Sequence, residues 1–330
     1  MNNHKKEPNY LESQNRVLFV GNGINDAQKI NWNAMLFYVQ DRLFKDKSID
    51  SEKISNLDGT SPTLFFESLS KSSSNPEETE KKLRDFVKDY VNDKSNFVHK
   101  LWDLYNVIIT TNFDNNLIIS NSNIFENDTN EKKLVHEKSV LYRRFDFIFE
   151  NQKKALFFPH GYFKNPGTIC LGYEQYIKNL RRIEDFLNTY YPENNTKKNK
   201  KISTSWIDYF VNDNKTIDIL GFSLCDEEID IWKVINHRKK ILEKIKNNTI
   251  NYYDLSLDLL GDENQKKRLD TKHKILKLFG INVIAIKDAK EYNSDFYSLC
   301  LKEIKEDMEK NLRIQKTDKS KKQNELTNEY

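Results

Sequence analysis

The sequence predicts an α/β fold, with a Rossmann-like parallel sheet, helices on both faces of the sheet, and a helical insertion. Short apolar runs recur along the chain, and they are nearly continuous in apolar character, which is typical of strands covered on both faces. Longer charged segments with helical spacing separate these runs. This alternation favours parallel strands joined by right-handed crossovers, and 330 residues are enough to bury a substantial core.

Five apolar runs predict the strands of the sheet. The first is RVLFVG at residues 16–21, a β-branched and aromatic run that ends in glycine. The other four lie at residues 106–112, 155–159, 215–222 and 281–287. The chain holds only nine glycines, well below the average usage of roughly 7%. We therefore expect a glycine at a strand end to mark a place where a side chain would not fit.

Charged segments with helical spacing lie between the predicted strands. They predict helices at residues 32–44, 77–91, 174–187, 227–245 and 291–311.

The sequence predicts one large domain over residues 16–310, preceded by an N-terminal extension at 1–15. The stretch from about 45 to 104 is longer than one crossover needs, so we expect it to form a helical insertion. Residues 311–330 are polar and charged, and they predict a flexible C-terminal tail.

Composition excludes several classes of protein. The 53 Lys and Arg against 50 Asp and Glu leave a net charge of only +3, so we expect no direct binding of nucleic acid. Cys170, Cys225 and Cys300 form no CxxC pair, which argues against a disulfide framework or a four-cysteine zinc site. No apolar run approaches the ~18 residues of a membrane span. We expect a cytoplasmic protein without a membrane partner.

Glycine or polar residues follow four of the predicted strands, where open α/β sheets bind their ligands. After the first strand come Gly21, Asn22, Gly23 and Asn25. Two glycines let the backbone turn sharply and approach a ligand, and the start of the next helix favours an anion such as a pyrophosphate. An ordinary strand-to-helix turn explains the same residues equally well, because the full GxGxxG pattern is broken.

The second motif follows the strand at 106–112 and contains Thr110, Thr111, Asn112 and Asp114. A helix cap would explain one of these polar residues, but it explains four polar groups close together less well.

The third motif is His160 and Gly161, directly after the run at 155–159. Imidazole has an ordinary pKa of about 6.5 and is the natural acid–base group at neutral pH. A satisfied core or surface histidine is the alternative. We expect the histidines in charged helical segments, His237 and His273 among them, to be solvated.

The fourth motif is Gly221, Phe222 and Ser223, at the end of the run at 215–222. A glycine and a small hydroxyl suit the ribose or phosphate of a nucleotide, and a simple turn is the alternative. The acids that follow, Glu228 among them, are explained by the dipole of the next helix.

In this order the four motifs resemble those of the sirtuin superfamily, and specifically its divergent bacterial sirtuin-like branch. The resemblance covers roughly residues 16–290. The matching segments are GNGIN at 21–25 for the GAGxS-type loop, TTNFD at 110–114 for TQNxD, HG at 160–161 for the catalytic HG, and GFS at 221–223 for the GTS-type ribose loop. Trp32, Met35 and Leu36 resemble the "W..LL" continuation of that branch, and ICLGYEQY at 169–176 resembles a second segment of the branch, in which a tyrosine follows a hydrophobic residue.

The resemblance implies an NAD+ glycohydrolase, which takes NAD+ as substrate and releases nicotinamide and ADP-ribose. It implies catalytic roles for Asn112, His160 and Asp114. The residues that it implies for NAD+ binding are Gly21, Asn22, Gly23, Asn25, Thr110, Thr111, Gly161, Gly221, Phe222 and Ser223.

The four-cysteine module of sirtuin deacylases has no counterpart in this sequence, so we expect no zinc. Two alternatives stay open: a sensor that binds NAD+ or ADP-ribose without cleaving it, and an NAD-dependent protein deacylase.

The resemblance also implies an antiphage defence effector that depletes NAD+ when infection is sensed. Such an activity must be silent in the resting cell. We therefore expect a regulator, either a homo-oligomer or a partner protein such as a HerA-type ATPase. The helical insertion and the C-terminal helix are the expected contact surfaces.

Overall fold

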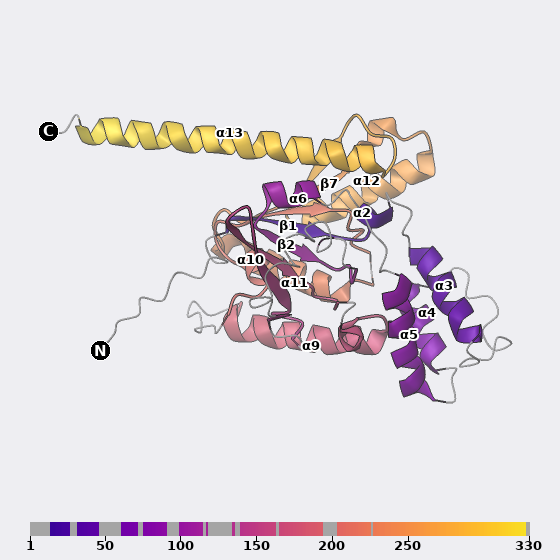
Figure 1. Cartoon of the computed structure of the whole chain (residues 1–330). Helices are drawn as coiled ribbons and strands as arrows, with labels where there is room; N and C mark the ends of the chain where they lie inside the picture. Colours follow the sequence, from indigo (N-terminus) through magenta and orange to yellow (C-terminus); the bar gives the residue numbers. More distant parts are fainter. Residues whose placement is uncertain are drawn as a thin grey trace, which may run out of the picture.

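One eight-stranded sheet forms the centre of the protein (Figure 1). The computed structural model describes residues 14–26, 32–45, 61–71, 75–90, 99–114, 117, 134–135, 139–162, 165–193, 203–225 and 227–327. The strand order is β3-β4-β5-β2-β1-β6-β7-β8. The strands are β1 (Arg16–Val20), β2 (Val107–Thr110), β3 (Leu134–Val135), β4 (Arg144–Phe149), β5 (Gln152–Phe157), β6 (Thr216–Leu220), β7 (Thr249–Leu255) and β8 (Ile281–Ile286).

The strands from β5 to β8 in this order are parallel, whereas β3 and β4 pair antiparallel at one edge. The predicted α/β class is confirmed. The parallel strands all end at the same edge of the sheet, so the four motifs that follow β1, β2, β5 and β6 are brought to one side of the molecule.

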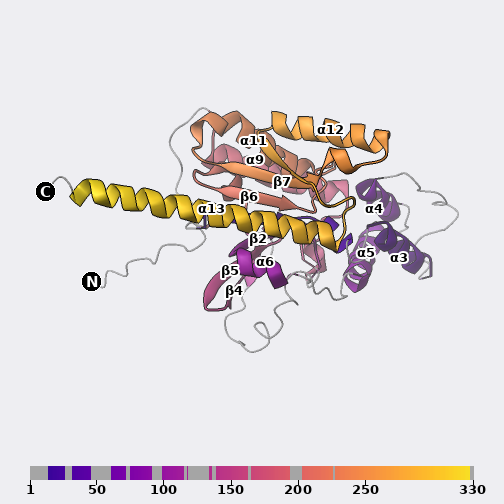
Figure 2. The same ribbon diagram turned by 90° about the horizontal axis from the view of Figure 1, so that it is seen from above.

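Helices cover both faces of the sheet, as predicted. Figures 1 and 2 show α9 and α11 on one face, α6 and α13 on the other, and α3, α4 and α5 grouped at one end of the molecule. The helices are α2 (Gly23–Asp26), α3 (Trp32–Lys45), α4 (Pro62–Lys71), α5 (Pro76–Tyr90), α6 (His99–Leu104), α9 (Tyr173–Tyr190), α10 (Asp208–Val211), α11 (Ile229–Ile241), α12 (Glu263–Leu278) and α13 (Ser294–Thr327). Helices α4, α5 and α6 lie in the range of the expected insertion. No helix within the described ranges is long and apolar enough to cross a membrane.

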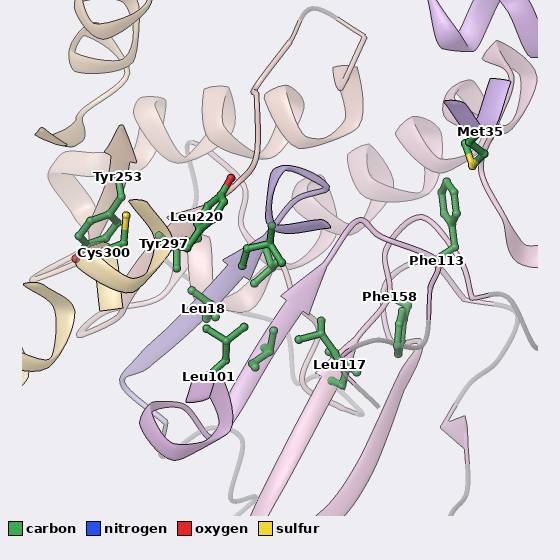
Figure 3. Packing of buried hydrophobic residues seen from close by; sticks show 14 of the residues in the cluster. Leu18, Met35, Leu101, Phe113, Leu117, Phe158, Leu220, Tyr253, Tyr297 and Cys300 are labelled. Atoms are coloured by element: carbon green, nitrogen blue, oxygen red, sulfur yellow. The ribbon is translucent and has the colours of Figure 1, made fainter. Parts of the chain in front are cut away.

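Strand β1 shows why the sheet needs cover on both sides. Its side chains alternate between the faces, and both sets are buried. Val17 and Phe19 belong to the apolar cluster under α9 and α11, whereas Leu18 and Val20 belong to the cluster under α6 and α13. Figure 3 shows Leu18 beside Leu101 of α6 in this second cluster.

Several elements differ from the sequence-based expectations. Strands β3, β4 and β7 and helix α12 were not predicted, and polar residues interrupt the apolar patterns of β4, β7 and α12. The predicted flexible tail at 311–330 is a further difference, since α13 continues without a break to Thr327. Residues 311–327 contain no glycine or proline, so no residue in them opposes the helix. Of the expected N-terminal extension, residues 1–13 lie outside the described ranges.

A buried carboxylate connects three of the central strands to α13. Asp218 on β6 has no exposed surface and pairs with Arg16 of β1 at 2.5 Å. It also accepts hydrogen bonds from the Tyr105 hydroxyl at 2.8 Å and from Asn251 of β7 at 2.9 Å. Arg16 in turn reaches Asp307 of α13 at 2.6 Å. The carboxylate therefore has enough donors to offset the cost of its burial.

Asp218→Ala should lower the free energy of unfolding by about 3 kcal/mol, because it leaves Arg16 without its buried partner. Urea unfolding followed by circular dichroism measures this change. Asp41→Ala, which removes a solvent-exposed pair with Lys45, serves as the control and should change stability little. Equal stability of Asp218→Ala and the wild type would contradict the assigned role.

Candidate functional site

A cavity of about 270 Å³ lies at the carboxyl ends of the parallel strands. Its lining comes from the loops after β1, β2, β5 and β6, and from β7, α9, α12 and α13. The residues predicted from the sequence that line it are Asn22, Gly23, Thr111, Asn112, His160, Gly221, Phe222 and Ser223. Asn112 and His160, which are far apart in the sequence, thus share one cavity.

The other predicted residues are Gly21, Asn25, Thr110, Asp114 and Gly161, and they are not among the residues that line this cavity. They hold the lining loops in place. Gly161 has a φ of +104°, and a Cβ there would lie 2.2 Å from the Thr168 carbonyl oxygen. Only glycine suits this turn, which sets the direction in which the chain leaves His160.

The loops after β1 and β6 contact each other through their backbones. The Gly21 N–H donates to the Leu220 carbonyl at 3.0 Å, and the Gly23 N–H donates to the Gly221 carbonyl at 2.7 Å. A Cβ on Gly21 would lie 2.5 Å from the Gly221 carbonyl oxygen. The glycines are therefore required for contact between the two loops. The N–H groups of Gly21 and Gly23 are engaged in that contact, so a pyrophosphate would need other donors.

The loop after β2 is fixed to the loop after β1 by side-chain amides. Asn112 Nδ2 donates to the Gly21 carbonyl at 3.2 Å, which fixes the plane of the Asn112 amide at the cavity. Asn25 Nδ2 donates to the Asp114 carboxylate at 2.6 Å. Both Asn25 and Asp114 are buried. Asp114 thus acts on the position of the loop, and its predicted catalytic role has no direct support from the lining of the cavity.

His160 lies between two carboxylates that both come from the segment after β6. Its Nε2 is 3.0 Å from Asp230, and its Nδ1 is 3.7 Å from Glu228. The imidazole is 2% exposed. Burial opposes the protonated form, but Asp230 and Glu228 outweigh burial and raise the pKa of His160 to about 9. His160 is therefore an imidazolium at neutral pH in the free protein.

Glu228 is a candidate functional residue that the sequence reasoning explained only by the helix dipole. It lines the cavity, and its Oε2 is buried without a hydrogen-bond partner among the described residues. Burial raises the pKa of Glu228 to about 7, although His160 opposes the rise. A carboxylate that titrates near neutral pH at a cavity wall can accept or donate a proton. Its place just before α11 gave no signal, because the helix dipole explains acids there.

The side chains of His160, Asp230 and Glu228 also form a candidate site for a metal ion. His160, Glu228 and Asp230 offer one nitrogen and two carboxylate oxygens within 4.8 Å of one another, a donor set that a divalent cation accepts. In the free protein the separations of 3.0 and 3.7 Å between the ring nitrogens and the carboxylates suit an imidazolium between two carboxylates. A divalent cation bound there would displace the imidazole proton.

The opposite end of the cavity is aromatic and carries a lysine. Tyr252, Tyr292 and Tyr297 line it together with Lys272 of α12. His273, the next residue, is buried and its Nε2 lies 3.0 Å from Asp254. The expectation that His273 is solvated was wrong.

The expectation that His237 is solvated was also wrong. This histidine is buried, and its Nε2 lies 2.7 Å from the Tyr191 carbonyl oxygen. In both cases a charged helix carries a buried histidine on its inner face, which composition alone does not show.

No family model matches the chain, and no curated protein matches it. The geometry of the cavity and the four sequence motifs are therefore the basis for inferring a function.

Asp230→Asn should lower the pKa of His160 from about 9, because the attraction of Asp230 is lost while burial still opposes the charge. An NMR titration of the imidazole measures this pKa. Glu227→Gln is the matched control, since it removes a neighbouring carboxylate that does not line the cavity. A pKa unchanged by Asp230→Asn would contradict the assignment.

His160 should also make stability depend on pH. Its pKa is about 9 in the folded protein and about 6.5 when unfolded. The stabilisation from its protonated form is then complete below pH 6.5 and lost as the pH rises to 9, on the order of 3 kcal/mol. The raised pKa of Glu228 acts in the same direction. Urea unfolding between pH 6 and 9 should show a steeper loss for the wild type than for His160→Gln, and parallel curves would contradict this.

Proposed function

We propose that this chain is a sirtuin-like NAD+ glycohydrolase, which cleaves the nicotinamide–ribose bond to give nicotinamide and ADP-ribose. One observation carries the proposal: Asn112, His160 and Glu228 line a single cavity at the carboxyl ends of the strands. This edge is where open α/β sheets bind nucleotides, and a titratable carboxylate and imidazole together in a cavity indicate an active site.

The order of the strands supports one orientation of the proposed substrate. His160 follows β5, Asn112 follows β2, and Phe222 and Ser223 follow β6, on the other side of β1. The nicotinamide ribose would lie at Asn112 and His160, and the adenosine would lie toward Phe222 and Ser223. The pyrophosphate between them would pass Asn22 and Gly23, in agreement with the order that the resemblance implies.

The charge of the site suits the transition state of this reaction. Cleavage of a glycosidic bond builds positive, oxocarbenium-like charge on the sugar. The cluster of His160, Asp230 and Glu228 has one negative charge in excess when both carboxylates are ionised and the imidazole is protonated. Such a fixed charge beside the sugar would stabilise the developing cation. Nicotinamide leaves as a neutral molecule, so its departure requires no acid.

Glu228 is the proposed proton acceptor. The attacking water gives a proton to the Glu228 carboxylate while its oxygen bonds to the anomeric carbon, and the electron pair of the C–N bond leaves with nicotinamide. His160 has a pKa of about 9 and is therefore a poor base at neutral pH. It would instead hold the Glu228 carboxylate in place, while the fixed Asn112 amide positions the water or a ribose hydroxyl.

A sensor that binds NAD+ or ADP-ribose without cleaving it is the second candidate. The observation in its favour is the His160 imidazole itself, which two carboxylates hold in the protonated form. Such a group can recognise a ligand without any exchange of protons.

The wider role that we propose is defence against phage by depletion of NAD+. Regulation would come from a homo-oligomer or from a partner such as a HerA-type ATPase. Helix α13 offers a contact surface, because Leu312 and Ile314 on it are exposed.

Incubation of the full chain with NAD+, with and without candidate partners, followed by chromatography, tests the proposed reaction. We expect nicotinamide and ADP-ribose in equal amounts, and kcat/KM should rise with pH through about 7 as Glu228 ionises. Glu228→Gln should lower the rate about 100-fold and abolish this rise. Asn112→Ala should lower it similarly, whereas Glu227→Gln should keep the rate at high pH and move the rise to lower pH, because Glu227 contributes to the raised pKa of Glu228.

The other outcomes separate the alternatives. Binding of NAD+ without release of nicotinamide, measured with and without candidate partners, would favour the sensor. Release that requires an acylated peptide would indicate the deacylase. Full activity of Glu228→Gln would overturn the assignment of the base.

A further inference from the structure

The end of the cavity at β7 and α12 has no part in the proposed cleavage, yet it carries a cation. Lys272 is 29% exposed and lines the cavity. Its Nζ donates to the Tyr252 hydroxyl at 2.5 Å, and this hydroxyl donates to the Phe222 carbonyl at 2.8 Å. The chain of hydrogen bonds fixes the ammonium beside the loop after β6, where the proposed adenosine would lie.

The carboxylate nearest to Lys272 is already occupied by other donors. Asp254 forms an ion pair with Lys272 at 3.7 Å, a separation longer than that of a direct hydrogen bond. His273 approaches the same carboxylate at 3.0 Å, and the Tyr292 hydroxyl donates to its other oxygen. Asp254 is fully buried and is not among the cavity residues. Lys272, with three donors, therefore keeps capacity to bind an anion in the cavity.

The two ends of the cavity differ in charge. Among the described residues that line it, Glu228 is the one carboxylate, and it lies at the His160 end. The Lys272 end is formed by phenols, phenylalanines and the ammonium. Dinucleotide sites for an unphosphorylated ribose place a carboxylate near the ribose hydroxyls, whereas a cation accommodates a phosphate there. Burial also lowers the pKa of Lys272, so an anion in contact with it would offset the cost of the buried charge.

We propose that Lys272 binds a phosphate monoester on the adenosine ribose, so that the site accepts the phosphorylated dinucleotide, as in NADP+, in addition to NAD+ and binds it more tightly. The inference rests on the proposed function for the orientation of the adenosine. The phosphate would accept charge-assisted hydrogen bonds from Lys272, and the Tyr252 hydroxyl holds the ammonium in place for this contact.

Calorimetric titration of the full chain with adenosine 2′,5′-bisphosphate and with AMP tests this proposal at constant ionic strength. The bisphosphate should bind about tenfold or more tightly than AMP. Lys272→Met should reduce this ratio to near one. Lys274→Met is the matched control, because Lys274 is an exposed lysine of the same helix that pairs with Asp270, and it should keep the wild-type ratio.

Each possible result of the titrations either supports or overturns the proposed phosphate binding by Lys272. Equal affinity of the wild type for the two nucleotides, binding of neither, or a preference that survives Lys272→Met would overturn the proposal, and the wild-type comparison stands even if the variant fails to fold. Preference for the bisphosphate without release of nicotinamide from NAD+ or NADP+ would support this inference and refute the proposed hydrolysis. Hydrolysis of NAD+ without the preference would do the reverse.

Discussion

The direct backbone contact between the loops after β1 and β6 is the constraint on which the cavity depends. Gly21 and Gly23 donate to the carbonyls of Leu220 and Gly221, and a Cβ at Gly21, Gly23 or Gly221 would clash with the opposite loop. Because the two loops meet without side chains between them, they form one continuous wall. Asn112 is then anchored to this wall through the Gly21 carbonyl. The low glycine content of the chain makes these three positions stand out.

Two buried carboxylates near the sheet, Asp218 and Glu228, differ in how completely their oxygens are hydrogen-bonded. Asp218 accepts hydrogen bonds from arginine, tyrosine and asparagine side chains, so its charge is satisfied and the cluster holds strands together. Glu228 has an oxygen without a hydrogen-bond partner among the described residues and faces a cavity. A satisfied carboxylate stabilises the fold, whereas one that is incompletely paired at a cavity wall is available for chemistry.

The sequence predicted the parts of the site that follow strands, and it missed the parts that lie on helices. Asn112 and His160 stand directly after apolar runs, where the carboxyl ends of parallel strands meet, so their convergence could be anticipated. Glu228 and Asp230 belong to a helix start, where acids are common for electrostatic reasons. Only the packing of α11 reveals that they face His160.

Strand β7 was missed for a related reason. Asn251 and Asp254 interrupt its apolar pattern and suggest a loop, but in the structure Asn251 donates to Asp218 and Asp254 pairs with His273. Polar residues in a buried strand are tolerated when their partners come from elsewhere in the chain, and a linear pattern does not show those partners. Lys272 could not be assigned to the cavity without this strand.

Helix α13 joins the interior of the protein to its periphery. Phe296 and Tyr297 near its start line the cavity, and Figure 3 shows Tyr297 and Cys300 close to Tyr253 of β7. The helix has 34 residues and therefore extends about 50 Å at 1.5 Å per residue, well beyond the sheet (Figure 2). One continuous helical backbone thus connects an outer segment that lies beyond the sheet to the two aromatic residues Phe296 and Tyr297 at the wall of the cavity.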